Sequence, residues 1–221
     1  MDNQTWDKGY DWTYKSYLES IENFRKSGYR LATFSDVLIN SYNKYLILRH
    51  DVDFNFESAY QLAQFEFKNK IPATYFFRVH ASGYNLFSVQ NIRKIHQIRS
   101  MGHEIGLHMD HGLNIYLSDE MANAQSQIHA FENLTNISIQ GFSSHEPARF
   151  GGVQLADELL KNSKLKYHAY QDRFFKDIKY LSDSTKRWRE EPFGHFVDIE
   201  PRLQVLIHPI WWHENIPQEG Y

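Results

Sequence analysis

Residues 44–54 read KYLILRHDVDF, an apolar run rich in strand-forming residues that ends in charged ones. A short continuous apolar run of this kind is typical of a strand that is buried on both faces of a parallel sheet. The carboxyl ends of such strands, and the loops that follow them, are where α/β proteins carry their chemistry. We therefore predict a buried strand that delivers Asp51 and Asp53 to a functional site.

Helix and strand patterns alternate on both sides of this strand. A helical pattern at 12–29 ends at Gly28, and Asn55 is a candidate N-cap for an amphipathic helix at 56–70. Further helices are predicted at 88–102 and 118–134, and further strands at 29–34, 72–79, 103–108, 137–145, 166–171, 178–184 and 203–209. Repeated β–α units predict an α/β protein with a parallel sheet, either a barrel or an open doubly wound sheet. Polar clusters at several strand ends favour the barrel.

The composition fits one globular domain over residues 1–221, with 42% hydrophobic and 16% aromatic residues. The formal net charge of -3 gives no electrostatic reason to expect nucleic acid. No apolar segment approaches the roughly 18 residues of a membrane span. The polar N-terminus lacks the apolar core of a signal peptide, so we expect a cytoplasmic protein. Because the chain has no cysteine, a transition metal would have to be held by His, Asp or Glu.

Asp51 and Asp53 are two residues apart, so in an extended strand both side chains project to the same side. Two neighbouring carboxylates repel each other, and burial increases this cost unless a cation or a shared proton relieves it. One interpretation is a strand end at which Asp53 and Asn55 cap the next helix. The other is a divalent metal site in which one aspartate is a ligand and the other is free to act as a base.

The segment GHEIGLHMDHG at 102–112 holds three histidines and two carboxylates. If 103–108 is a strand, His103 and His108 lie roughly 16 Å apart, at ~3.3 Å per residue, and cannot share a metal. We expect His103 to be structural and His108, at the carboxyl end, to be a metal ligand. His111 can fall on the same face as His108 if the chain turns after the strand. Asp110 is an alternative ligand, or a group that orients a histidine.

Two more predicted strands end in histidine. The segment SSHEPARF at 143–150 contains His145 and Arg149, and LIHPIWW at 206–212 contains His208. A single histidine in such a place is more often structural than a ligand. Four strands that end in His or Asp indicate a shared site, because in a barrel these ends meet at one mouth. Aromatic residues near this mouth that could pack against a ligand, or belong to the core, are Tyr84, Phe87, Trp188, Trp211 and Trp212.

The order of these motifs resembles the polysaccharide deacetylase (NodB-homology) superfamily, in particular its branch with RHDVD and GHEIGLH motifs. The likeness extends over residues 44–212 and rests on LRHDVD, PATYFF, GHEIGLH and LIHP. It implies an irregular (β/α) barrel of about seven parallel strands. It also implies a hydrolase that removes N- or O-acetyl groups from sugars with a divalent metal, expected to be zinc. The implied partner is a carbohydrate of surface-polysaccharide metabolism.

The resemblance assigns roles to five residues when the motifs are matched position by position. Asp51 matches the catalytic base, and Asp53 matches a metal-ligand aspartate. His108 matches the first ligand histidine. His208 matches the general acid, and Asp183 resembles the carboxylate that orients this acid.

Two departures from the family pattern affect the expected metal site. The second ligand histidine of the family lies four residues after the first, where this chain has Gly112. His111 stands one position earlier, and we take it as the third ligand, with Asp110 and His145 as alternatives. The arginine–proline motif of the family is replaced by a segment that begins at His145, so either His145 completes the metal shell or Arg149 supplies the missing arginine's function.

Two other functions are open on the sequence alone. A non-catalytic carbohydrate-binding relative of the deacetylases is compatible with the altered motifs, although Asp51 and His208 are retained. A metal-dependent phosphoesterase is suggested by the adjacent His50 and Asp51. In the helical HD-type phosphohydrolases this dipeptide lies on a helix, whereas here it ends a predicted strand.

Overall fold

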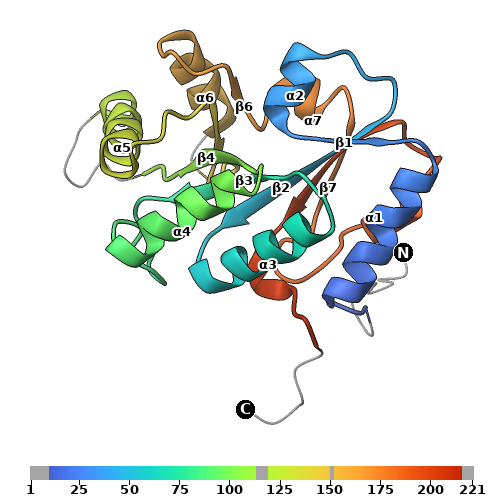
Figure 1. The fold of residues 1–221 in the computed structure, drawn as a ribbon. Coiled ribbons are helices and arrows are strands. Elements are labelled where there is room, and N and C mark those ends of the chain that lie inside the picture. The colour runs from blue at the N-terminus through green and yellow to red at the C-terminus, as the bar shows by residue number, and fades with distance from the viewer. Residues whose placement is uncertain (1–9, 113–118, 150–151, 216–221) are drawn as a thin grey trace.

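The computed structural model describes residues 10–112, 119–149 and 152–215. Strands and helices alternate along these ranges (Figure 1). The strands are β1 (Arg30–Ala32), β2 (Tyr45–Val52), β3 (Thr74–Arg78), β4 (Glu104–Met109), β5 (Gly141–Ser144), β6 (Tyr167–His168), β7 (Lys179–Ser182) and β8 (Arg202–Ile207). The helices are α1 (Tyr14–Lys26), α2 (Phe34–Ile39), α3 (Phe56–Lys68), α4 (Val89–Ser100), α5 (Glu120–Thr135), α6 (Gly152–Lys161) and α7 (Asp172–Phe175), with short 3-10 helices η1 (Phe193–Phe196) and η2 (Pro209–Trp211).

The strands pair in parallel within one sheet. Seven of them follow each other in the order β6-β5-β4-β3-β2-β8-β7, and β1 pairs with the first half of β2. The sheet curls into a barrel. This barrel is open between β6 and β7, because these two strands do not pair within the described residues. The prediction of an irregular (β/α) barrel of about seven parallel strands is confirmed.

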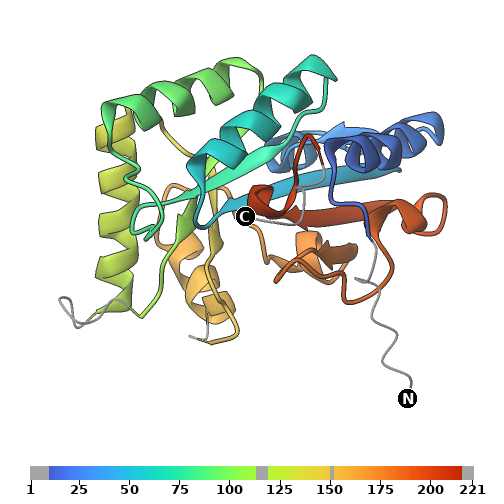
Figure 2. The ribbon, with the colours of Figure 1, turned by 90° about the horizontal axis from the view of Figure 1, so that it is seen from below.

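Helices cover the outer face of this barrel. The two views show α3 and α4 side by side over strands β2 to β4 (Figures 1 and 2). Asn55 caps α3 as predicted, since its side chain accepts a hydrogen bond from the backbone N–H of Ser58 at 3.1 Å. Among the described helices, none combines the length and the apolar character that crossing a bilayer requires.

Alternation along β2 decides which of its side chains enter the barrel. Ile47 lies in an inner cluster with Phe76, whereas Leu48 lies in the larger cluster beneath the outer helices. Because successive side chains of a strand point to opposite faces, Arg49 and Asp51 continue the inner side of β2 beyond Ile47. The first half of β2 therefore contributes apolar side chains to the interior of the barrel, and its last residues contribute charged side chains to the barrel mouth.

The two glycines of the GHEIG motif have backbone roles. Gly102 follows α4 with φ at +94°, a conformation that L side chains rarely adopt. A Cβ on Gly106 would lie 2.4 Å from the ring of Phe76, which is closer than packed atoms can approach. These residues let β4 pass beside the inner cluster and place His108 near the carboxyl end of the strand.

A buried polar network lies behind the sheet, between β2 and α3. The carboxylate of Glu66 accepts hydrogen bonds from the hydroxyls of Tyr17 at 2.5 Å and Tyr75 at 2.6 Å. Nε2 of His50 lies 2.8 Å from the same carboxylate, and all four side chains are fully buried. His103 is buried beside this network, with Nε2 at 3.1 Å from a carbonyl oxygen of α3, which agrees with the structural role that we predicted.

Replacing Glu66 by Leu is expected to lower the free energy of unfolding by about 3–5 kcal/mol, because the change removes one partner of a buried polar pair. It leaves His50 and two tyrosine hydroxyls without their acceptor. Urea denaturation followed by circular dichroism measures this change. The matched control is Glu57→Gln on the same helix, whose exposed ion pair with Lys94 is worth about 0–1 kcal/mol. Equal losses in the two variants would contradict the importance given to the network.

Candidate active site

The carboxyl ends of four parallel strands meet at the mouth of the barrel. Asp53 follows β2, His108 belongs to the last residues of β4, His145 follows β5, and His208 follows β8. A groove of about 860 Å³ runs over these four side chains. Further residues that line the groove come from the loops around them and include Phe54, Arg149, Tyr170, Phe175, Tyr180, Arg189 and Trp211.

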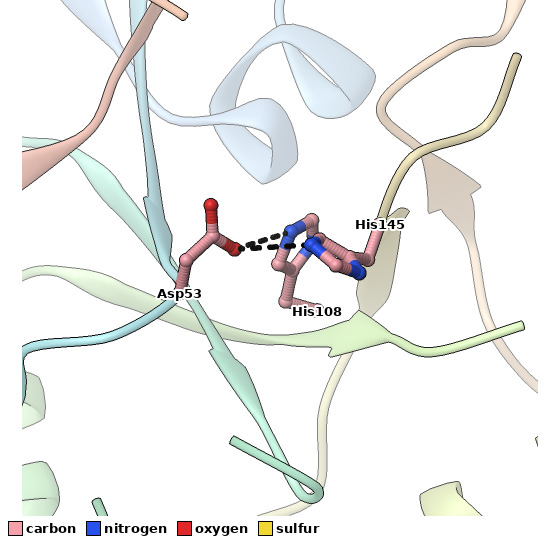
Figure 3. Close-up of side chains that lie close together, drawn as sticks. All are labelled: Asp53, His108 and His145. Carbon is pink, nitrogen blue, oxygen red and sulfur yellow. Dashed lines mark ion pairs between the residues drawn. The ribbon is translucent and has the colours of Figure 1, made fainter. Parts of the chain in front are cut away.

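Asp53, His108 and His145 form a candidate metal centre (Figure 3). One donor atom of each residue lies within 4.8 Å of the donor atoms of the other two. Oδ1 of Asp53 is 3.1 Å from Nε2 of His108 and 3.9 Å from Nε2 of His145. This oxygen is buried and has no hydrogen-bond partner among the described residues. An unsatisfied buried carboxylate oxygen that faces two imidazole nitrogens is the arrangement expected where a cation binds.

The other ring nitrogen of each histidine is held by a neighbour. Nδ1 of His108 lies 2.7 Å from the hydroxyl oxygen of Ser143. Nδ1 of His145 lies 3.2 Å from Oδ1 of Asp110. Metal-binding histidines almost always use their second nitrogen in this way, which leaves Nε2 of both rings for the ion. One carboxylate oxygen and two imidazole nitrogens suit zinc in a site with an open position, so the residues present fit a divalent metal.

The backbone fixes the position of His145 next to β4. Its N–H donates a hydrogen bond of 2.8 Å to the carbonyl oxygen of Met109, which continues the pairing of β5 with β4 by one residue. Glu146, which follows, has φ at +46°, so the chain turns sharply away after the histidine. The imidazole therefore enters the site directly from the end of a strand.

The carboxylates of Asp53 and of the neighbouring Asp110 are ionised at neutral pH. Burial would raise the pKa of Asp53, but the neighbouring imidazoles, His108 first, outweigh it and lower this pKa below its usual range. Burial would also raise the pKa of Asp110, but hydrogen bonds from His145 and Arg78 outweigh it and lower this pKa to about 2. Asp53 and the neighbouring Asp110 thus carry negative charge, which favours binding of a cation.

His111 is not part of this group. Its side chain is buried, and neither ring nitrogen has a hydrogen-bond partner among residues 10–112, 119–149 and 152–215. Burial lowers its pKa. Asp110 forms an ion pair with Arg78 at 2.6 Å and contacts His145, so it orients a histidine. The structure thus brings Asp53 and His108 together with His145, which the sequence left as an alternative.

Asp51 lies deep in the barrel beside the candidate metal centre. Its two carboxylate oxygens accept hydrogen bonds from Nε and Nη2 of Arg49, at 3.0 and 2.7 Å. Oδ2 lies 3.6 Å from Nε2 of His108. Burial would raise the pKa of Asp51, but Arg49, followed by His108, outweighs it and lowers the pKa. Asp51 is therefore an ionised carboxylate that faces the centre without belonging to it.

Arg49 is a site residue that the sequence analysis missed. It is fully buried, and it also donates hydrogen bonds to the hydroxyl of Tyr170 at 2.9 Å and to Oε1 of Gln204 at 3.3 Å. The available signal was its position two residues before Asp51, which places both on one side of the strand. Arg149, which we considered for a missing arginine, is exposed and pairs with Glu146 at 3.2 Å.

His208 follows β8, which pairs with β2 on the side away from β3 and β4, and it is held by Asp183, which follows β7. Nδ1 of the ring lies 2.6 Å from Oδ1 of Asp183, and the indole N–H of Trp212 donates to Oδ2 at 2.9 Å. Nε2 lies 3.6 Å from Oδ2 of Asp53. Burial would lower the pKa of His208, but the fully buried carboxylate of Asp183 outweighs it and raises this pKa to about 9. The ring is therefore protonated at neutral pH, and its Nε2–H points toward the centre.

The aromatic residues divide between the core and the groove. Trp211 lines the groove, as we considered from the sequence. Trp188 and Trp212 are core residues with 1% of their surface exposed. The hydroxyl of Tyr84 donates to the carbonyl oxygen of Val52 at 2.7 Å, and Phe87 packs against the core. Four of these five aromatic side chains thus have structural roles, and Trp211 is the one available to a ligand in the groove.

No protein-family model and no curated protein matches the sequence. Solved structures match the fold. IcaB from Ammonifex degensii has a TM-score of 0.53 at 15% sequence identity, covering 89% of this chain and 85% of that one. A mutant of the peptidoglycan deacetylase PdaC from Bacillus subtilis has a TM-score of 0.50 at 18% identity, covering 76% of each chain.

A third match is a mutant of BA3943, a CE4 family pseudoenzyme from Bacillus anthracis, with restored enzymatic activity. Its TM-score is 0.51 at 18% identity, over 77% of this chain. This chain covers 58% of the length of that longer protein. At these identities the likeness concerns the fold. The chain therefore has the barrel fold that is found in the CE4 polysaccharide deacetylases.

Proposed function

We propose that this chain is a metal-dependent member of the polysaccharide deacetylase superfamily that hydrolyses the acetyl group of an N- or O-acetylated sugar. The observation that carries the proposal is that one groove holds the three groups that such a hydrolysis needs. They are the candidate metal centre, the ionised carboxylate of Asp51 and the protonated ring of His208. Hydrolysis of an acetamide needs an activated water, a base for its proton and an acid for the leaving amine.

Asp53, His108 and His145 would hold the ion, and zinc is the expected metal for this set of oxygen and nitrogen ligands. When bound, the ion lowers the pKa of a water molecule and polarises the carbonyl group of the substrate. In this proposal His145 takes the place that the sequence assigned to His111. Asp110 orients His145 through Nδ1.

Asp51 would accept the proton of the attacking water as general base. Its Oδ2 is within 3.6 Å of a ligand nitrogen, so it stands next to the position at which the water is activated. Arg49 holds both carboxylate oxygens and keeps the group ionised. A positioned base of this kind contributes about 10²–10⁴ in rate.

His208 would donate its Nε2 proton to the leaving nitrogen or oxygen as general acid. Asp183 fixes the ring through Nδ1 and raises its pKa, so the acid form is present at neutral pH. The base and the acid line the same groove, and Nε2 of His208 lies 3.6 Å from Oδ2 of Asp53. A substrate in the groove would lie between them, with Trp211 and Tyr180 available to pack against a sugar ring.

Release of acetate tests this function. The zinc-loaded chain is incubated with a panel of N-acetylated and O-acetylated oligosaccharides, and free acetate is measured with and without a chelator. We expect metal-dependent release from at least one substrate, and none from Asp53→Ala, which removes a ligand. A zinc-loaded protein that binds sugars from the panel but releases no acetate would contradict the enzyme and support the carbohydrate-binding alternative.

Replacing Asp183 by Asn is expected to lower kcat by about 10²-fold, within the range of general acid–base catalysis. The change keeps the shape of the side chain but removes the charge that raises the pKa of His208. Because activity requires protonated His208, the alkaline limb of the pH–rate profile moves to lower pH in the variant. The profile of kcat against pH measures both effects. An alkaline limb at the same pH in both proteins would contradict the role of this pair.

A further inference from the structure

Ser143 occupies a fully buried position between two groups of the site. It is on β5, directly opposite His108 in the pairing of β5 with β4. Its hydroxyl oxygen lies 2.7 Å from Nδ1 of His108 and 3.2 Å from Oδ1 of Asp51. Through this one oxygen, Ser143 contacts both the proposed base and a proposed metal ligand.

The direction of these hydrogen bonds follows from the number of protons available. Asp51 already accepts two hydrogen bonds from Arg49, and an ionised carboxylate has no proton to donate. The hydroxyl of Ser143 must therefore donate its only hydrogen to Asp51. Its oxygen is then left to accept, so the hydrogen of the contact with His108 must come from Nδ1.

We infer that Ser143 is a positioning residue that fixes the Nδ1–H tautomer of His108 and ties this ligand to the base Asp51. With Nδ1 donating to Ser143, Nε2 is the ring nitrogen left for the ion, and it is the atom that faces Asp53 at 3.1 Å. The same chain of contacts passes from the guanidinium of Arg49 through Asp51 and Ser143 to the imidazole. The inference rests on the proposed metal site, since Nε2 of His108 faces a carboxylate oxygen at 3.1 Å and acts as a ligand only when a cation lies between them.

The two ligand histidines are thus oriented in different ways. His145 donates to the ionised carboxylate of Asp110, which also pairs with Arg78. His108 donates to the neutral hydroxyl of Ser143, and this hydroxyl donates in turn to Asp51, the proposed base. A change at Ser143 should therefore affect both the affinity for the metal and the rate, whereas a purely structural hydroxyl would affect only stability.

The tautomer of His108 in the zinc-loaded protein tests the inference without any variant. Long-range ¹H–¹⁵N correlation spectra distinguish a ring that is protonated on Nδ1 from one that is protonated on Nε2. We expect Nδ1–H in the wild-type chain. An Nε2–H tautomer would overturn the inference, whatever the outcome of the acetate assay.

Ser143→Ala then tests the function of the contact. We expect the variant to bind Zn²⁺ about 10- to 100-fold more weakly, as is typical when an orienting neighbour is removed. The control is Thr135→Val, which removes another buried hydroxyl, one that donates to the carbonyl oxygen of Phe131 on α5. This control should leave the zinc affinity unchanged.

Thermal unfolding confirms that both variants are folded before zinc is titrated in competition with a chromogenic chelator. Unchanged zinc affinity in Ser143→Ala, or equal losses in Ser143→Ala and Thr135→Val, would overturn the inference. A wild-type chain with Nδ1–H and the expected loss in Ser143→Ala, but no acetate release, would leave the inference standing and contradict the proposed enzyme.

Discussion

The variant Asp51→Asn is expected to bind zinc as the wild-type chain does and to lose about 10²–10⁴ in kcat, because an amide cannot accept the proton of the attacking water. Asp51 lies 3.6 Å from Nε2 of His108 but is not one of the three proposed ligands, so its replacement removes no ligand. Steady-state acetate release and zinc titration on the same preparation measure the two quantities separately. A parallel loss of zinc binding would contradict the assignment of Asp51 as base.

The same substitution has a cost in stability that must be separated from its effect on catalysis. Arg49 is fully buried, and its guanidinium loses its charged partner, which costs about 3–5 kcal/mol when one side of a buried ion pair is removed. The double variant Arg49→Met with Asp51→Asn removes both charges. We expect it to recover much of the stability and none of the activity. Recovery of activity with stability would show that Asp51 has only a structural role.

The second large effect is expected for the third ligand of the metal. His145→Ala should lower zinc affinity by more than about 100-fold, which exceeds the usual effect of losing an orienting neighbour. The matched control is His111→Ala, because His111 is a buried histidine of the same region that lies outside the group of three. Its removal should leave zinc affinity unchanged. Competition titration with a chelator measures both variants, after thermal unfolding has shown that each is folded.

The reverse result would be equally clear. If His111→Ala loses zinc and His145→Ala keeps it, the ligand set favoured by the sequence is right and the one proposed from the geometry is wrong. Asp110→Asn distinguishes the role of the orienting carboxylate. We expect it to weaken zinc binding by about 10- to 100-fold, between the two histidine variants.

Much of the fold could be predicted from local sequence, because each strand and helix carries its own pattern. The run at 44–54 is a buried strand because its residues are apolar on both faces, and the structure places β2 there in the middle of the sheet. The turn at Gly102 and the N-cap at Asn55 are decided within a few residues of chain. α6 was not expected, since its stretch showed no regular pattern that we recognised.

The candidate site was predictable where alternation along a single strand determines it, and less so where different strands must be compared. Asp51, Asp53 and His108 could be placed at a barrel mouth from their strand ends alone. The choice between His111 and His145 depends on the pairing of β5 with β4, which extends one residue further through the N–H of His145. Single-sequence patterns contain no register between strands, so this choice needed the three-dimensional structure.

The central claim is that Asp53, His108 and His145 bind one divalent metal ion. A crystal structure of the zinc-loaded chain, with anomalous diffraction recorded on both sides of the zinc absorption edge, tests it directly. The account predicts one anomalous peak at the barrel mouth, with Nε2 of both histidines and a carboxylate oxygen of Asp53 at about 2.0–2.2 Å. A peak coordinated by His111 or Asp110 in place of His145, or no peak at this mouth, would contradict it.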